Sequence, residues 1–596
     1  MLAEQVAAGT LPPVEERLPK NPVVVDENYF AEGTMDAWQP GTYGGEMRVS
    51  HNEPNNAPDV FFMVMQPIIR LQNTLSDGEM MDNICLFLGN NEDATEFTFQ
   101  IREGLKWSDG VPVTTEDVRF AYEDITLNKD VWPSTLGWCT SDGVAAELTI
   151  VDDLTFKFTF HQTTGSFLRT IMLSNWVEYT RIIKPAHYLK QFHKDYATPE
   201  ELTALCAEAG YPADDWHKLI IDKDTADRAI TSRNAMGIPV LNPFVLTQIA
   251  NEVYVYERNP YYFKVDSEGK QLPYLDRIVS PKVQDGEMEN MRMIAGEADI
   301  LRRNAALLKL PLYKANEAAG DYTTLIREQH LSVPSMLMFE YQFGTESDQA
   351  VVADKRFRLA VSHGINRQEI IDVVYLGMGE LPTLIPSEFD PDKANALLDE
   401  MGMAIGADGW RTAPGGEPYA LLIETGNEAV DLLPSIEIAA SHLREYLKLN
   451  ASIRSNDTTL FSQAGAAGLI QCRTLWAFDA MAVDEYTTRW MPGSWNRWNT
   501  NRLIGEAPDF NGGIEPPEWA MEGFALRSEI NMLVFGTEEY AVNLEKQKAF
   551  FYDNVPAIPL LQRSKLPIPL ANKFGNVQSG GYQITLLMSV EQMFIK

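Results

Sequence analysis

Residues 97–122 leave this chain few choices of local structure. They begin with an alternation of apolar and polar residues that predicts a half-buried strand, with Phe97, Phe99 and Ile101 on its apolar side. Ser108-Asp-Gly110 then predicts a turn, and Thr115 predicts the cap of a helix whose first turn is acidic. The apolar residues of that helix share one face: Val118, Ala121, Tyr122 and Ile125. The stretch is therefore predicted to be a strand, a turn and a helix.

Four other stretches predict further elements by the same physics. The pattern predicts strands at Glu46–Val49, Tyr254–Tyr256 and residues 331–343. It predicts two successive helices over residues 354–372. In the second of these helices, Asn366 and Glu369 have the spacing of a capping box. Further helices are expected from Asp390-Pro391 to Gly402 and near Glu538–Asp553.

The run at 97–122, tFxIREGlkWSDGvPvTteDVxFAYE, also carries a resemblance. It is similar to the signature of the extracytoplasmic solute-binding proteins of the peptide/nickel family (oligopeptide-binding, family 5), which feed ABC importers. Three more passages resemble the same family: Arg258–Asp276, Gly296–Asp299 and Asp354–Asp372. Within the first of them, Asp266–Lys270 is better explained by a hairpin turn than by a calcium loop, because it lacks the ligand spacing and the final Glu of an EF-hand.

The resemblance implies an α/β fold of the two-lobed periplasmic-binding-protein type with a hinge. Lobe I would be discontinuous, with residues 1–60, an extra subdomain at 61–180, residues 181–337 and a return at 561–596. Lobe II would span 338–560. The hinge would lie at Phe339, Glu340 and Leu561. A monomer that docks on a membrane permease is the family expectation.

The composition excludes some classes of function. The chain has 596 residues, with 49 Lys and Arg against 84 Asp and Glu and a formal charge of −35, which repels nucleic acid and anionic lipid. No apolar run approaches the ~18 residues of a transmembrane helix. The N-terminus shows no signal peptide, so we expect a chain that begins near the start of the mature protein. With the resemblance, this favours a periplasmic or extracytoplasmic location.

The sequence offers no motif for catalysis, a metal or a cofactor. It lacks HExxH, GxSxG, P-loop and GxGxxG patterns, so we expect no catalytic residue, no metal ligand and no cofactor. The cysteines Cys85, Cys139, Cys206 and Cys472 form no CxxC pair, and their spacing leaves open whether they form one or two disulfides or none.

The best candidate for ligand binding is Leu475–Trp498. This segment holds four of the chain's 12 tryptophans, Trp476, Trp490, Trp495 and Trp498, which could stack on sugar rings or pack inside lobe II. It corresponds to the family's ligand loop, which in peptide binders resembles FDxxxxGWxADYxxP and supplies an Asp for the ligand's α-ammonium. Counted from Phe478-Asp479 to Pro492, that Asp position is Thr488 here, with Asp484 and Glu485 at the Gly-Trp position.

The missing carboxylate sets the predicted ligand class. Burying an ammonium group without a carboxylate is costly, so a peptide ligand is disfavoured unless Asp484 or Glu485 takes that role. Arg489 and Trp490 instead suit a polyol ring or a carboxylate-bearing solute, including opine-like compounds. The prediction is a receptor that closes on a polar solute between two lobes, with an oligosaccharide or other non-peptide solute slightly favoured. The alternatives are an oligopeptide-binding protein of the same family, a sensory module for a membrane receptor, and a hydrolase that uses cleft carboxylates.

Overall fold

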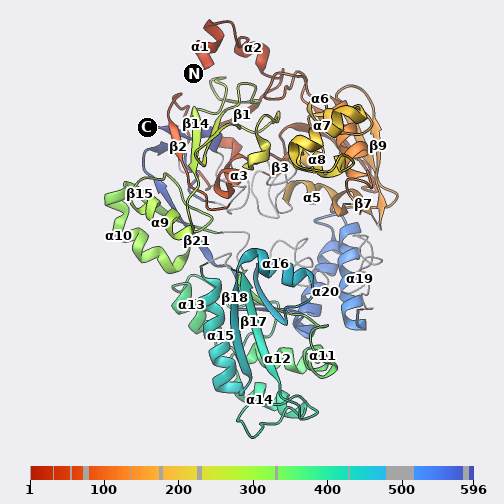
Figure 1. The fold of residues 1–596 in the computed structure, drawn as a ribbon, viewed down its shortest axis with the longest axis vertical. Helices are drawn as coiled ribbons and strands as arrows, with labels where there is room; N and C mark the ends of the chain where they lie inside the picture. The colour runs from red at the N-terminus through yellow and green to blue at the C-terminus, as the bar shows by residue number, and fades with distance from the viewer. Residues whose placement is uncertain are drawn as a thin grey trace. The chain divides into compact units, whose positions relative to one another are not determined.

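The computed structural model describes residues 2–30, 33–35, 37–53, 57–71, 80–133, 136–141, 143–173, 179–224, 231–328, 333–426, 430–477, 516–580 and 590–596. The chain divides into two compact units (Figure 1). Unit 1 comprises Met1–Ala305, Leu312–Arg327 and Pro567–Lys596, and unit 2 comprises Ala306–Pro311 and Glu328–Leu566. The residue limits predicted for the lobes and the subdomain stay predictions.

The signature at 97–122 folds as its pattern predicts. Strand β6 (Glu96–Ile101) alternates half-buried and buried residues, and the four apolar residues predicted for the helix are all buried. The helix begins as α4 (Thr115–Arg119) and continues as a π-helix over Phe120–Thr126. Its N-cap is Thr114, one residue before the predicted Thr115, and Thr114 shares a capping box with Asp117. The hydroxyl of Thr115 instead donates to the carbonyl of Asp152 at 2.8 Å.

Unit 1 is built on two four-stranded sheets. The antiparallel order β5-β6-β10-β9 holds the signature strand, and the order β11-β12-β14-β2 is antiparallel except for its parallel β14-β2 pair. The strands are β1 (Val23–Val25), β2 (Glu46–Arg48), β3 (Ile69–Leu71), β4 (Met80–Asp82), β5 (Cys85–Asn90), β7 (Thr140–Ser141), β8 (Val144–Ala145), β9 (Glu147–Ile150), β10 (Thr155–Thr159), β11 (Phe244–Ala250), β12 (Val253–Arg258), β13 (Lys264–Asp266), β14 (Arg277–Pro281), β22 (Phe574–Gly575) and β23 (Phe594–Ile595).

Helices and a predicted hairpin complete unit 1. The other helices are α1 (Leu2–Ala7), α2 (Val14–Arg17), α3 (Pro58–Val64), α5 (Phe167–Leu173), α6 (Ala186–Leu189), α7 (Pro199–Ala209), α8 (Trp216–Lys223), α9 (Gly286–Ile294) and α10 (Leu310–Gly320). The side chain of Asp266 accepts hydrogen bonds from the backbone N–H groups of Glu268 and Lys270, each at 2.8 Å, which confirms the predicted turn. Strands β15 (Tyr322–Glu328) and β21 (Lys565–Ala571) pair with each other where the chain passes between the units.

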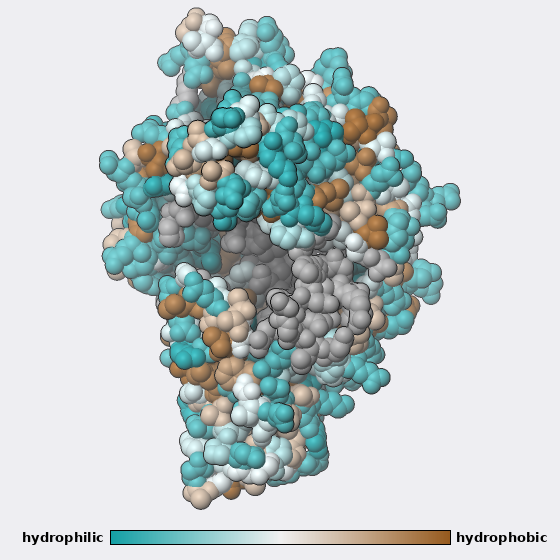
Figure 2. All heavy atoms as spheres, turned by 45° about the vertical axis from the view of Figure 1, so that its right-hand side comes forward, coloured by the Kyte–Doolittle hydropathy of each residue, from teal (hydrophilic) through white to brown (hydrophobic). Residues whose placement is uncertain are grey.

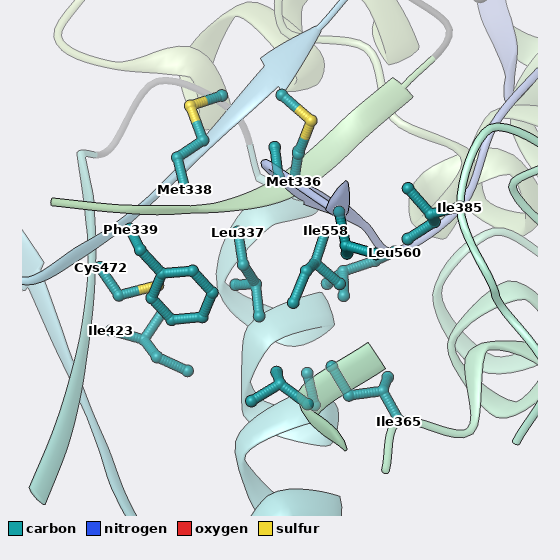
Figure 3. Packing of buried hydrophobic residues seen from close by; sticks show 14 of the residues in the cluster. Met336, Leu337, Met338, Phe339, Ile365, Ile385, Ile423, Cys472, Ile558 and Leu560 are labelled. Carbon is teal, nitrogen blue, oxygen red and sulfur yellow. The ribbon is translucent and has the colours of Figure 1, made fainter. Parts of the chain in front are cut away.

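Unit 2 has one five-stranded sheet in the order β18-β17-β19-β16-β20. Its strands are β16 (Val333–Phe339), β17 (Ala420–Gly426), β18 (Asn450–Asn456), β19 (Cys472–Ala477) and β20 (Ile558–Pro559), and its helices are α11 (Glu346–Ala353), α12 (Lys355–His363), α13 (Arg367–Val374), α14 (Pro391–Glu400), α15 (Leu432–Leu447), α16 (Thr458–Ala466), α19 (Glu518–Met532) and α20 (Glu538–Asn554). Figure 3 shows how side chains of this sheet pack against helix α15. Those that point toward the helix are Leu337, Phe339 and Ile558, and those that point away are Met336 and Met338.

The predicted helix pair at 354–372 is present as α12 and α13. Asn366 caps α13 by accepting a hydrogen bond from the N–H of Glu369 at 3.4 Å. The reciprocal half of a capping box is not formed, because the carboxylate of Glu369 lies 2.9 Å from Nε2 of His442 instead. The helix predicted from Pro391 is α14, and the one predicted near 538–553 is α20.

Two further sequence expectations concern the surface and the thiols. On the face shown in Figure 2, most of the described side chains are hydrophilic, which fits the excess of acidic residues. All four cysteines are buried and unbridged, which resolves the question that their spacing left open. Among the described residues, no helix is both long and apolar enough to cross a membrane.

Candidate functional site

The carboxyl ends of three parallel strands meet at one edge of the unit 2 sheet. Strand β17 runs parallel to both β18 and β19, so the strand ends Gly426, Asn456 and Ala477 lie along this edge. In open α/β sheets, ligands bind outside the carboxyl ends of the strands. The edge is therefore the part of unit 2 in which a ligand site is expected.

The predicted ligand segment begins at this edge. Trp476 is the second-to-last residue of β19 and is half-buried. Strand alternation places it on the same face of the sheet as Cys472 and Thr474. The other predicted ligand residues lie outside the described residues and stay predictions: Asp484, Glu485, Thr488, Arg489, Trp490, Trp495 and Trp498.

A half-buried carboxyl group that the sequence analysis missed lies at the start of α15. Asp431 precedes this helix, and burial raises the pKa of its carboxyl group above the usual range. The hydroxyl of Ser435 donates to the carbonyl of Asp431 at 2.7 Å and lies 3.1 Å from the hydroxyl of Tyr375. The sequence signal was weak, because an Asp before a helix is an ordinary cap.

The three predicted hinge residues are all buried within unit 2. Phe339 is the last residue of β16 and packs in the core, and Leu561 follows β20. The N–H of Glu340 donates to the carbonyl of Gln471 at 2.9 Å, which ties the end of β16 to the start of β19. Their role as a hinge stays a prediction.

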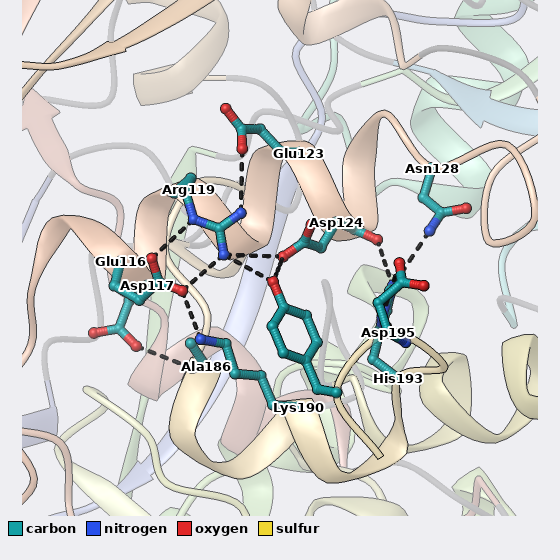
Figure 4. Close-up of polar contacts among 11 residues, drawn as sticks. Glu116, Asp117, Arg119, Glu123, Asp124, Asn128, Ala186, Lys190, His193 and Asp195 are labelled. Atoms are coloured by element: carbon teal, nitrogen blue, oxygen red, sulfur yellow. Dashed lines mark hydrogen bonds and ion pairs between the residues drawn. The ribbon is translucent and has the colours of Figure 1, made fainter. Parts of the chain in front are cut away.

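A second polar cluster, in unit 1, surrounds Arg119 of the signature helix (Figure 4). Arg119 donates two hydrogen bonds to Glu116, at 2.7 and 2.8 Å, and one each to Glu123 and Asp124, both at 3.1 Å. Lys190 also donates to Glu116, at 2.6 Å, and the hydrogen bond from Arg119 is the main cause that lowers the pKa of Glu116 to about 2. Because these carboxylates are matched by cations, the cluster ties α4 to the segment after α6 and is structural.

The histidines do not form a metal centre in the part of the chain that the structure describes. His187 pairs with Asp109, with Nε2 and Oδ2 2.8 Å apart, and His51 lies buried with its Nδ1 2.8 Å from the hydroxyl of Ser280. Over the described ranges, no group of three or more His, Cys, Asp or Glu residues is placed to hold a metal ion.

Comparisons with known proteins extend this picture. The sequence model of one family, bacterial extracellular solute-binding proteins, family 5 Middle, matches residues 88–502. The periplasmic alpha-galactoside-binding protein of Rhizobium meliloti (strain 1021) is 29% identical over 312 residues, which cover 50% of this chain and 40% of that protein. The chain spans about half the length of the curated relatives it matches.

Two solved structures share the fold. The periplasmic binding protein MelB of Agrobacterium fabrum C58, in complex with stachyose, matches with a TM-score of 0.75 and 20% identity over 99% of this chain and 89% of its own. The oligopeptide-binding protein OppA matches with a TM-score of 0.67 and 25% identity over 100% of this chain and 96% of its own. These matches confirm the predicted two-lobed α/β fold class.

Proposed function

This chain belongs to family 5 of the bacterial extracellular solute-binding proteins, and on that premise we propose that it captures a polar solute outside the cytoplasm for an ABC importer. The family match over residues 88–502 carries the proposal, because that range includes parts of both compact units. The family and its neighbours are binding proteins rather than enzymes, so the proposed function is capture and delivery without covalent chemistry. Its partners would be the solute and a membrane permease, with the receptor acting as a monomer.

For the ligand class we propose an oligosaccharide. Two observations support it: the named relative binds alpha-galactosides, and the structure of MelB is a complex with stachyose. The tryptophan-rich segment after β19 supplies flat apolar side chains that can stack on sugar rings. Trp476, Arg489 and Trp490 are the proposed ligand contacts, and Phe339, Glu340 and Leu561 are the proposed hinge.

Ligand binding to the folded protein tests this proposal. Stachyose is expected to raise the melting temperature of the full chain, because a ligand at about 100 times its Kd stabilises the folded state by roughly 2.7 kcal/mol. Trialanine at the same concentration is the control and is expected to produce no shift. A rise with trialanine and none with stachyose would contradict the proposed ligand class while leaving the receptor function intact.

Oligopeptide binding is the second candidate, and one feature of the structure favours it. Strand β19 ends at Ala477, and in Trp476-Ala-Phe-Asp479 the Asp follows the Trp by three residues, as in the Trp-x-Ala-Asp motif of the peptide binders, although Ala stands one residue earlier than in that motif. This count replaces the one that starts the motif at Phe478-Asp479, and under it the ammonium-binding Asp would be Asp479 rather than Thr488. The 25% identity with OppA supports the same candidate.

The variant Asp479→Asn separates the two candidates. If the chain binds peptides through Asp479, this substitution is expected to weaken trialanine binding by about tenfold or more, because it leaves the ligand ammonium without a carboxylate. If the chain binds stachyose instead, neither wild type nor Asp479→Asn is expected to bind trialanine measurably. Isothermal titration with both ligands measures each case.

A further inference from the structure

One face of the unit 2 sheet carries a row of charged side chains. The strand register aligns Glu424 on β17 with Arg454 on β18 and with Arg473 on β19. Residues aligned on adjacent strands point to the same face of a sheet. Met338 on β16 is aligned with Arg473 on β19, and in Figure 3 it points away from helix α15. The charged row therefore lies on the face of the sheet opposite α15.

Glu424 is fixed in this row by only one of its two carboxylate oxygens. Its side chain is 1% exposed, and Oε1 accepts hydrogen bonds from Nε of Arg454 at 2.8 Å and from Nδ2 of Asn456 at 3.1 Å. Oε2 is buried and has no hydrogen-bond partner. Leaving a buried carboxylate oxygen unpaired costs free energy. Because no hydrogen bond offsets the negative charge on Oε2, that charge can act on neighbouring groups.

Arg473 is the neighbour on which this charge acts. Its guanidinium lies against α16, where a Cβ atom on Gly465 would be 2.9 Å from Nη2 of Arg473. Burial lowers the pKa of Arg473, and the charges of Glu340 and Glu424 oppose that effect. Across the described ranges, its N–H groups have no hydrogen-bond or ion-pair partner.

The position of Arg473 suits contact with a ligand. It is half-buried and level with Glu424, two residues before the carboxyl end of β17. From Arg473, β19 continues to Trp476, where the tryptophan-rich segment begins, although strand alternation places Trp476 on the other face of the sheet. The guanidinium N–H groups of Arg473 therefore lie near the sheet edge at which ligands of open α/β sheets bind.

We propose that Arg473 determines ligand specificity by donating hydrogen bonds to a hydroxyl group of a neutral carbohydrate, and that Glu340 and Glu424 keep this site from accepting a carboxylate. The inference rests on the proposed function and deepens it by separating neutral sugars from sugar acids. Two carboxylates already offset the charge of this guanidinium, so an anionic ligand would add a third negative charge nearby. A hydroxyl accepts the same hydrogen bonds without that repulsion.

Isothermal titration of the full chain with stachyose and with trigalacturonate tests the inference. Arg473→Met is expected to weaken stachyose binding by about tenfold or more, because the charged donor is lost. Glu424→Gln is expected to raise the affinity for trigalacturonate relative to stachyose by about tenfold, because one repelling charge is removed. Arg356→Met, which removes an exposed guanidinium from α12 of the same unit, is the matched control and is expected to change stachyose binding less than about threefold.

The outcomes separate this inference from the proposed function. The inference alone would be overturned if Arg473→Met bound stachyose as tightly as wild type does. It would also be overturned if Glu424→Gln kept the wild-type ratio of affinities for trigalacturonate and stachyose. A wild-type protein that prefers trigalacturonate would also overturn it, whereas one that binds neither sugars nor peptides would overturn the proposed function itself. If Arg473→Met does not fold, Arg473→Lys keeps the charge but loses the planar donor fork, and a loss of stachyose affinity is still expected.

Discussion

Replacing Arg358 with methionine is expected to destabilise unit 2 by about 3–5 kcal/mol. The side chain is 1% exposed and ends among the carbonyl groups of two helix ends. Nη1 donates to the carbonyls of Val352 and Ala353 in α11, at 2.7 and 2.8 Å, and Nε donates to the carbonyl of Val555 just after α20, at 3.1 Å. The C-terminus of a helix has carbonyl groups without hydrogen-bond partners and a partial negative charge. A buried guanidinium donates hydrogen bonds to those carbonyls and also offsets the partial charge.

The large effect follows from what methionine leaves behind. It fills much of the volume of arginine but donates no hydrogen bond, so buried carbonyls at two helix ends lose their partner. Arg358→Lys is expected to recover part of the loss, because an ammonium group reaches fewer of these carbonyls than the planar guanidinium. Amide hydrogen exchange of α12 measures the change locally, without requiring that the whole chain unfold in one step.

Arg356 is the matched control on the same helix. Its guanidinium is 40% exposed and pairs with Asp354 at 2.6 Å, a surface ion pair of the kind that contributes little to stability. Arg356→Met is therefore expected to leave the exchange of α12 nearly unchanged. Equal effects of Arg356→Met and Arg358→Met would refute the role assigned to the buried guanidinium.

Arg358 also shows which part of this fold could be predicted from the sequence. The start of α12 could be predicted, because helix caps and apolar spacing are local. The burial of Arg358 could not, because Lys355, Arg356 and Arg358 together read as a solvated basic face. What buries Arg358 is the end of α20, almost 200 residues later in the chain, and local patterns do not report such contacts.

The candidate site divides in the same way. The sequence predicts Trp476 as a ligand contact from composition, and this stays a prediction; the structure shows that it is the second-to-last residue of β19. The roles proposed for Arg473 and Glu424 could not be predicted, since a single charged residue in a short strand is uninformative until the strand register is known. The one-residue error at Thr115 has a different cause: the capping-box spacing of Thr114 and Asp117 is present in the sequence, and the structure forms that box, while the hydroxyl of Thr115 contacts Asp152.

Glu289→Gln is expected to stabilise unit 1 near pH 8 and to have little effect near pH 4.5. Glu289 lies on α9, is 2% exposed, and accepts a hydrogen bond from Nδ2 of Asn304 at 3.0 Å. Burial, reinforced by the charge of the buried Asp59, raises the pKa of Glu289 from 4.5 to about 8. Glu53 also raises this pKa, while Asn304 and Arg303 lower it.

The sign of the pH dependence follows from proton linkage. Between pH 4.5 and 8 the unfolded chain has released the proton of Glu289, while the folded protein still holds it. Folding must then take up a proton, so the free energy of unfolding falls as pH rises through this window, by about 5 kcal/mol in total at the stated pKa values. Below pH 4.5 both states are protonated and the stability from this group is fully present.

Glutamine removes the titration and keeps the contact. Its side-chain carbonyl can accept the same hydrogen bond from Asn304, so Glu289→Gln should match wild type near pH 4.5 and melt at a higher temperature near pH 8. Calorimetric melting of both proteins from pH 4.5 to 8.5 measures the difference. Glu287, an exposed residue on the same helix, gives the control: Glu287→Gln should follow the wild-type curve within about 0.5 kcal/mol at every pH. Parallel curves for wild type and Glu289→Gln would mean that Glu289 ionises in the folded protein as a surface glutamate does, despite its burial beside Asp59.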